Sequence, residues 1–213
     1  MHFISEALED YVAIHSENDP EILQQLNKET HQKILQPRMF SGHFQGRVLS
    51  MLSKIIHPKH ILELGTYTGY ATLCLAEGMQ TDGTIDTIDI NEELEEIQEK
   101  YFNLSDYKGK IVQHIGDAME IIPTLNKKFD LVFIDADKEN YINYWNLIVP
   151  MMNKGGIILS DNVLWSGKVL EEVKKNDKST PILLEYNRIT KEDPRVETVL
   201  LPIRDGLTVS RVL

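Results

Sequence analysis

Hydrophobic residues recur with two different periods along the 213-residue chain. From position 61 onward, short apolar runs of strand length alternate with longer stretches in which apolar residues follow helical spacing. The expected strands are 61–64, 84–88, 111–115, 130–134 and 156–160, and the expected helices between them are 70–78, 92–103, 118–124 and 139–152. This alternation predicts an α/β fold in which helices cover both faces of a parallel sheet.

The amino-terminal part has a helical pattern of its own. Residues 3–35 are expected to be helical, and Asp19-Pro20-Glu21 is a start signal with a capping Asp and a Pro at the first helical position. Apolar residues between 48 and 56 then follow helical spacing until His57-Pro58 breaks it. We expect residues 1–56 to form a helical cap on the core.

The carboxyl-terminal part departs from the alternating pattern. Asp205-Gly206 separates two strand-like runs, 196–203 and 207–212, and this dipeptide between strands is a hairpin signal. The sheet should therefore end in an antiparallel pair, which brings the expected number of strands to seven. The polar stretch 166–180 is expected to be a mobile surface connection. With no repeat or linker, we expect one domain over 1–213.

Composition narrows the class of protein. Hydrophobic residues make up 42% and charged residues 26%, which are ordinary globular values. The 22 basic and 33 acidic residues give a net charge of -11, which disfavours a partner bound mainly through phosphate contacts. The single Cys74 excludes an internal disulfide. No apolar run reaches membrane-spanning length, and acidic residues interrupt the first ten positions, so we expect a cytoplasmic protein without a membrane partner.

Two of the expected strands end in hard oxygen ligands. Asp135 follows the run 130–134, and Asp161-Asn162 follows the run 156–160. Ligands collect at the carboxyl ends of parallel strands, and two carboxylates with one amide oxygen suit Mg²⁺ or another hard divalent ion. Asp and Asn are also common turn residues at the ends of strands, and either run alone would favour this simpler interpretation. Both runs together, with Lys138 three residues after Asp135, favour a metal site.

A glycine loop, Glu63-Leu64-Gly65-Thr66-Tyr67-Thr68-Gly69-Tyr70, follows the first strand. Tyr67 occupies the place of the second glycine that a pyrophosphate needs, so NAD and FAD are disfavoured, whereas a nucleoside without that group is compatible. Asp89 ends the second strand, where an acid commonly bonds ribose hydroxyls, although it also fits a helix cap, the role we expect for Asn91. The third loop, Gly116-Asp117-Ala118, is placed to meet an adenine ring.

With these loops in order, the chain resembles the S-adenosylmethionine-dependent methyltransferases. More narrowly, it is similar to the small cation-dependent O-methyltransferases of the catechol and caffeoyl-CoA type, bacterial members included. The resemblance covers nearly the whole chain and implies a Rossmann-like class I methyltransferase fold, with the core over 57–213. Its most specific pieces are the glycine loop, Phe133-Ile134-Asp135-Ala136-Asp137-Lys138, Asp161-Asn162-Val163-Leu164-Trp165, and Asp193-Pro194-Arg195 with the Asp205-Gly206 hairpin.

The resemblance implies a role for each matching residue. The implied cofactor site comprises Met39, Glu63, Gly65, Thr66, Gly69, Ala71, Asp89, Asp117, Ala118 and Asp135. Asp135, Asp161 and Asn162 match the metal ligands, and Lys138 matches the proposed general base, so Lys138 and Asp135 are the catalytic candidates. Ala71 departs from relatives that often carry Ser there, and Thr72 or backbone groups are expected to substitute. Trp165 is expected in the pocket wall.

The implied reaction is methyl transfer from S-adenosylmethionine to a vicinal hydroxyl of a catechol-like or hydroxycinnamoyl-type small molecule, with Mg²⁺, Mn²⁺ or Ca²⁺. A phenol is little ionised at neutral pH, so a cation that coordinates the oxygen would help. One alternative acceptor is a hydroxylated uridine in transfer RNA, for which lysines between 168 and 178 offer a basic patch. Another alternative is a non-catalytic cofactor-binding module. A homodimer is expected from the family.

Overall fold

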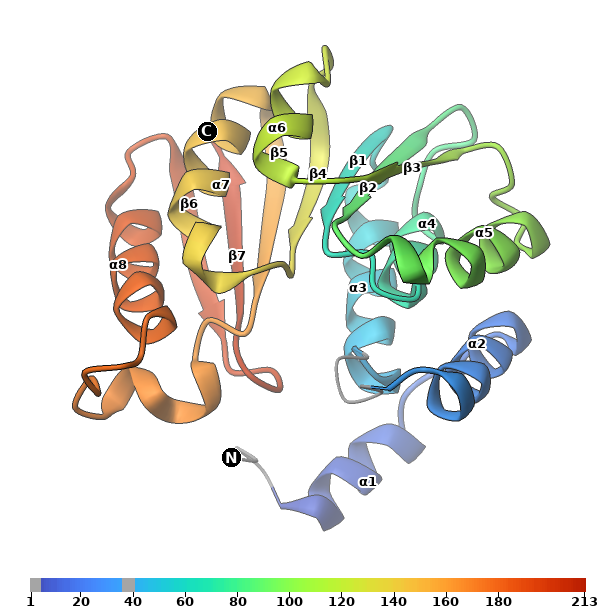
Figure 1. Ribbon diagram of the computed structural model, residues 1–213, viewed down its shortest axis with the longest axis horizontal. Helices are drawn as coiled ribbons and strands as arrows, with labels where there is room; N and C mark the ends of the chain where they lie inside the picture. Colours follow the sequence, from blue (N-terminus) through green and yellow to red (C-terminus); the bar gives the residue numbers. More distant parts are fainter. Residues whose placement is uncertain (1–4, 36–40) are drawn as a thin grey trace.

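The computed structural model describes residues 5–35 and 41–213 and contains a seven-stranded sheet of order β3-β2-β1-β4-β5-β7-β6 (Figure 1). The strands are β1 (His60–Leu64), β2 (Thr84–Asp89), β3 (Ile111–Ile115), β4 (Phe129–Ile134), β5 (Met152–Asp161), β6 (Val196–Leu201) and β7 (Leu207–Val212). β1 to β5 are parallel to one another, and β7 pairs antiparallel with both β5 and β6. The predicted parallel sheet with its closing hairpin is confirmed.

Helices cover both faces of the sheet. They are α1 (Glu6–Ile14), α2 (Glu21–Lys33), α3 (His43–Ile56), α4 (Tyr70–Ala76), α5 (Glu95–Leu104), α6 (Ala118–Ile121), α7 (Tyr141–Ile148) and α8 (Ser179–Glu192). Short 3-10 segments are η2 (Glu92–Leu94), η3 (Ile122–Thr124), η4 (Lys138–Asn140), η5 (Val149–Met151) and η6 (Trp165–Leu170). The predicted helix break is confirmed, since α3 ends at Ile56 and His57 is left-handed with φ 53°.

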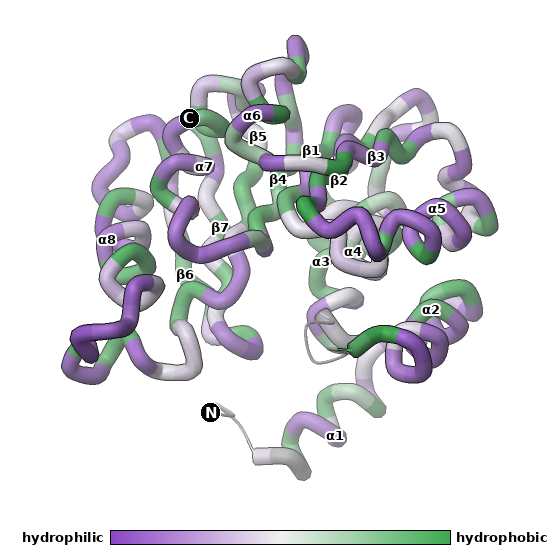
Figure 2. The backbone as a smooth tube through the Cα atoms, viewed as in Figure 1, coloured by the Kyte–Doolittle hydropathy of each residue, from purple (hydrophilic) through white to green (hydrophobic). Residues whose placement is uncertain are grey.

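The core consists of two apolar clusters, one on each face of the sheet. Successive strand residues point to opposite faces, so Leu62 packs in the cluster of Trp145 and Tyr186, whereas its neighbour Ile61 packs in the cluster of Leu26. Figure 2 shows hydrophobic tube along the central strands and hydrophilic tube along the connection before α8. No helix in the described ranges combines the length and the apolar character that a bilayer span requires.

The structure corrects three expected boundaries. β5 begins at Met152 and not at 156, because β4 and β5 pair from Phe129 opposite Met152, and the register then shifts before Leu131 meets Ile157. β6 ends at Leu201, two residues before the expected end. The stretch 166–180 contains most of η6 and the first two residues of α8, a helix that was not among those expected from the sequence.

The expected capping role of Asp19 is wrong. Pro20 is the residue before the first turn of α2, and no side chain caps that turn. The Asp19 carboxylate accepts hydrogen bonds from His43 Nδ1 at 2.9 Å and Tyr70 Oη at 2.8 Å, and it lies 3.2 Å from Arg47 Nε. A nearly buried guanidinium requires carboxylate partners, so Asp19 is turned inward and ties the start of α2 to α3 and α4.

Close packing of α3 against the end of α4 generates a stability prediction. A Cβ added at Gly78 would lie 2.1 Å from the carbonyl carbon of Ser53 and 2.2 Å from the nitrogen of Lys54, and neither backbone atom can move aside. We expect Gly78→Ala to lower the free energy of unfolding by about 3 kcal/mol. Gly109→Ala is the control, since open space surrounds Gly109 and only its φ of +78° opposes a side chain, at about 1 kcal/mol. Urea denaturation followed by circular dichroism measures both, and equal losses would contradict the steric explanation.

Candidate functional site

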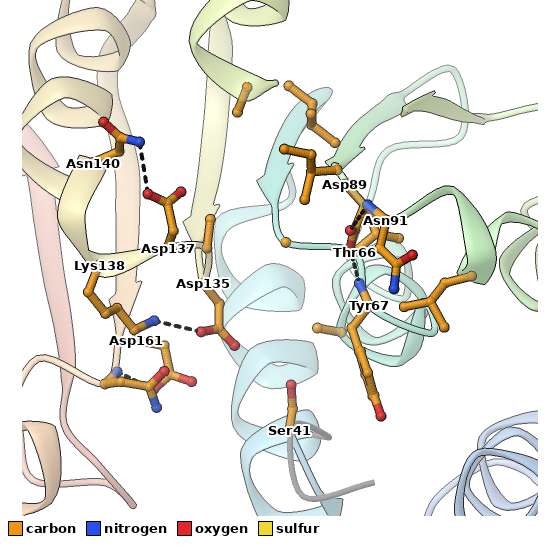
Figure 3. A pocket seen from close by; sticks show the side chains of 18 of the residues that line it. Ser41, Thr66, Tyr67, Asp89, Asn91, Asp135, Asp137, Lys138, Asn140 and Asp161 are labelled. Atoms are coloured by element: carbon orange, nitrogen blue, oxygen red, sulfur yellow. Dashed lines mark hydrogen bonds and ion pairs between the residues drawn. The ribbon is translucent and has the colours of Figure 1, made fainter. Parts of the chain in front are cut away.

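A cavity of about 1370 Å³ opens at the carboxyl ends of the parallel strands. The glycine loop after β1, the loops after β2 and β3, the segment after β4, the end of β5 and the β6–β7 turn all contribute to its lining. In Figure 3, Thr66, Tyr67, Asp89 and Asn91 lie on one side of it and Asp135, Lys138 and Asp161 on the other. This is the position at which doubly wound α/β sheets bind ligands.

The glycine loop runs directly against the end of β4. Gly65 has φ +94°, and a Cβ there would lie 2.0 Å from the carbonyl oxygen of Asp135, so the chain needs glycine at this point. Tyr67 N then donates to Asp89 Oδ2 at 2.6 Å, and Asn91 N donates to Asp89 Oδ1 at 2.8 Å. The Asp89 carboxylate therefore joins the loops after β1 and β2, and its remaining lone pairs can accept hydroxyl donors from the cavity.

The helical segments that follow β2 and β3 are each capped by a side chain of the loop before them. Asn91 Oδ1 accepts from Glu93 N at 3.1 Å, which confirms its expected capping role. Asp117 Oδ1 accepts from Met119 N at 2.8 Å and so caps α6. Asp117 and Ala118 line the same cavity as Asp89.

Some of the residues expected at the cofactor site do not line the cavity. Glu63 is fully buried beneath the loop and accepts hydrogen bonds from Thr72 and from Thr87 at 2.6 Å. Thr72 is therefore engaged away from the cavity, so of the two substitutes expected for the missing Ser beside Ala71, the Thr72 side chain is excluded and the backbone groups remain. Gly69 serves packing, since a Cβ there would lie 2.5 Å from the ring of Phe102. Met39 lies outside the described residues.

Asp135 and Asp161 face each other across the ends of β4 and β5. Lys138 Nζ donates to Asp135 Oδ1 at 3.0 Å and to Tyr141 Oη at 2.7 Å. Asp161, only 3% exposed, accepts from Gln45 Nε2 at 2.5 Å and from Asn162 N at 2.8 Å. Burial, followed by the charge of Asp135, raises the pKa of the Asp161 carboxyl above its ordinary range.

Three residues of this arrangement were missed in the sequence. Gln45, on the first turn of α3, holds Asp161, and Arg204 Nη1 in the β6–β7 turn donates to Gln45 Oε1 at 2.9 Å. Tyr141 accepts from Lys138 and donates to the Asp161 carbonyl oxygen at 2.8 Å. Gln45 lies 116 positions before Asp161 and 159 before Arg204, and no local pattern links residues so far apart.

Asp137 and Trp165 also line the cavity that holds Asp135 and Asp161, which we call the acidic pair. Asp137 accepts from Tyr144 Oη and from Asn140 Nδ2 at 2.8 Å, so its carboxylate is already partnered. Trp165 lines the cavity, as predicted, with Lys168 Nζ 5.4 Å from the centre of its ring.

The oxygen ligands around Asp135 and Asp161 decide whether the site fits a divalent cation. Among the described residues, no group of three or more His, Cys, Asp or Glu side chains is placed to hold a metal ion. Asp135 and Asp161 do provide two hard carboxylates that repel each other when both are ionised, and Asn162 lines the same cavity with an amide oxygen. This donor set fits a hard cation that takes its remaining ligands from acceptor and water.

Comparison with known proteins gives one consistent relationship. A model of the O-methyltransferase family matches residues 13–213. Caffeoyl-CoA O-methyltransferase 5 of Nicotiana tabacum is 34% identical over 220 residues, which cover 97% of this chain and 91% of the relative. The caffeoyl-CoA O-methyltransferase of Petroselinum crispum is 33% identical, with the same coverage.

Two solved structures that are similar to this chain are also methyltransferases. The O-methyltransferase of Bacillus cereus in complex with SAH superposes with a TM-score of 0.90 at 25% identity, covering 97% of both chains. The SAH-bound Podospora anserina methyltransferase PaMTH1 superposes with a TM-score of 0.88 at 26% identity, covering 100% of this chain and 98% of the other.

Glu63 generates a prediction about pH and stability. Burial raises the pKa of Glu63 from 4.5 to about 8. Between these values the native protein keeps the proton while the unfolded chain loses it, so rising pH lowers the free energy of unfolding. Glu63→Gln cannot ionise, and we expect its stability advantage over the wild type to grow by up to a few kcal/mol from pH 5 to pH 8.

Urea denaturation of the cofactor-free protein at both pH values measures this difference. Glu99→Gln, on the exposed face of α5, controls for the loss of one negative charge. A Glu63→Gln advantage that is equal at pH 5 and pH 8 would show that Glu63 is ionised throughout.

Proposed function

Since the chain belongs to the family of S-adenosylmethionine-dependent O-methyltransferases, we propose that it methylates one of two vicinal hydroxyls on an aromatic small molecule, catechol-like or of the hydroxycinnamoyl type, with a divalent cation. The observation that carries this proposal is the convergence of Asp135 and Asp161, with Lys138 beside them, in the cavity that the glycine loop also lines. The names of the plant relatives support the choice of a hydroxylated aromatic acceptor.

The Asp89 side of the cavity is proposed to bind the cofactor. The backbone at Gly65 lies against Asp135 just after β4, so a ligand on the loop at Gly65 would be close to Asp135. Asp89, fixed by two backbone N–H groups, would accept hydrogen bonds from ribose hydroxyls. Asp117 and Ala118 would border the adenine. This arrangement supports a reactive methyl group pointing toward the acidic pair.

The Asp161 side is proposed to hold the cation and the acceptor oxygen. Two carboxylates at close range in a buried site are unfavourable when both are charged, and a cation between them removes that repulsion. Asp135, Asp161 and Asn162 would hold the ion. When bound, a divalent cation stabilises the ionised form of a phenol and orients its oxygen. A vicinal second hydroxyl can chelate, which is why we propose a catechol-like acceptor.

Lys138 is proposed to receive the acceptor proton at Nζ. In the transfer, the bond between sulfur and methyl carbon breaks, the bond between acceptor oxygen and methyl carbon forms, and the hydroxyl proton must leave. Nζ donates two hydrogen bonds, to Asp135 and Tyr141. A neutral amine has two N–H groups and one lone pair, so it can keep both bonds and still accept a third proton.

Chelation tests the proposed cation directly. We expect a chelator to abolish transfer of labelled methyl groups from S-adenosylmethionine to catechols and hydroxycinnamoyl thioesters, and Mg²⁺ or Mn²⁺ to restore it. The Asp161→Asn variant should not regain methyl transfer at ordinary metal concentrations, because it has lost one of the two carboxylates that offset the charge of the cation. Asp106→Asn, at an exposed position after α5, is the charge-matched control.

Full activity of the verified metal-free wild type would refute cation dependence and leave the broader methyltransferase function. The same assay on transfer RNA with a hydroxylated uridine tests the alternative acceptor.

The pH profile of Lys138→Met tests the base. The variant should fold and bind cofactor normally while turnover falls at neutral pH, because nothing accepts the acceptor proton. The deficit should shrink as pH approaches about 10, where a phenol ionises by itself. Turnover of wild type and variant on one catechol between pH 7 and pH 10 measures this. A deficit that is constant across that range would instead mean that Lys138 positions Asp135.

A further inference from the structure

Arg204 brings a positive charge to the acceptor side of the cavity. It lies in the turn between β6 and β7 with φ +49°, a left-handed conformation that is uncommon for a residue with a side chain. The turn is fixed to the segment after β5, because Leu164 N donates to Asp205 O at 2.9 Å and Ser166 N donates to the Asp205 carboxylate. The Arg204 backbone is therefore anchored beside the loop that follows Asp161.

Arg204 differs from the other cations of the cavity in its partners. Three cationic side chains among the described residues line the cavity. Lys33 Nζ lies 2.8 Å from Glu29 Oε1, and Lys138 Nζ lies 3.0 Å from Asp135 Oδ1. Within residues 5–35 and 41–213, no carboxylate lies at ion-pair distance from the Arg204 guanidinium. Its charge is therefore available to an anion that enters the cavity.

The hydrogen bond that Arg204 makes determines how far its guanidinium lies from the Asp161 carboxylate. Nη1 donates to Gln45 Oε1, and the other end of the same amide donates to Asp161 Oδ2. One amide group thus separates the guanidinium from the Asp161 carboxylate, which is within the span of one acceptor molecule. An Arg side chain has five N–H donors in a planar fork, so most of them remain for a carboxylate, which that fork fits bidentately.

We propose that Arg204 selects acceptors that carry a carboxylate, which it binds while the acceptor hydroxyls lie at Asp135 and Asp161. The inference rests on the proposed function, because it assumes that the hydroxyls occupy that position. Acidic side chains outnumber cations in the cavity lining and repel anions in general. A carboxylate is therefore favoured only when it meets the guanidinium directly, which makes the contact selective.

Two acceptors of nearly equal shape test the proposal, 3,4-dihydroxybenzoate and its neutral analogue 3,4-dihydroxybenzamide. Calorimetry with Mg²⁺ and S-adenosylhomocysteine present should show tighter binding of the acid to the wild type. Arg204→Gln should weaken acid binding by roughly tenfold or more and amide binding by less than about threefold. Arg204→Lys should fall between, since it keeps the charge without the fork.

Arg211→Gln is the matched control, because Arg211 lies on β7 of the same hairpin and faces Glu197 at 3.7 Å. It should leave the affinities for both ligands unchanged. Equal losses for acid and amide in Arg204→Gln would overturn the proposal and show that Arg204 acts on Asp161 through Gln45. No preference of the wild type for the acid would also overturn it. Arg204-dependent, acid-selective binding supports the proposal even if neither ligand is methylated, and that last result would contradict the proposed acceptor class alone.

Discussion

The site depends on two carboxylates that the parallel sheet places side by side. β4 and β5 are adjacent and parallel, with Ile134 opposite Ser160, so the residues that follow meet at one edge. These residues are Asp135 and Asp161, and the second is almost fully buried. Removing both charges from water while bringing them together is costly unless a cation offsets them. Lys138 Nζ lies 3.0 Å from Asp135 Oδ1, and the proposed divalent ion would offset the charge of the two carboxylates.

The carboxylates of Asp89 and Asp161, in the two halves of the cavity, have different surroundings. Asp89 receives backbone N–H groups from Tyr67 and Asn91, so main-chain dipoles stabilise its charge and it can accept neutral hydroxyls. Asp161 also receives two donors, yet burial and its neighbour still raise its pKa. We infer that the first half suits a nucleoside and the second a metal ion. The close approach of Gly65 to Asp135 joins the halves.

Much of this arrangement could be predicted from the sequence, because the signals are local. Apolar runs of strand length identify the strands, and the residues after each run must lie at the same edge of a parallel sheet. Asp89, Asp135 and Asp161 were predicted in this way. Their partners could not be predicted, because the Gln45–Asp161 and Gln45–Arg204 hydrogen bonds are tertiary contacts across 116 and 159 positions.

Local signals also failed where one pattern serves two purposes. Asp before Pro is typical of a helix start, but Asp19 is used as a partner for the nearly buried Arg47. Thr72 follows Ala71 in the cavity wall, yet its hydroxyl bonds the buried Glu63. In both cases a buried ionisable group elsewhere in the chain decided the orientation of the side chain, and sequence spacing alone carries no information about it.

The binding of a divalent cation at Asp135 and Asp161 can be measured most directly by titration with Mn²⁺, because this requires neither cofactor nor acceptor. The free ion is followed by its electron paramagnetic resonance. We expect one Mn²⁺ site in the wild type that Mg²⁺ displaces. Asp161→Asn should weaken it by roughly tenfold or more, since a charged ligand becomes neutral while its shape is retained. Absence of a site in the wild type, or the same affinity in Asp161→Asn, would contradict the assignment of Asp135 and Asp161 to a divalent cation.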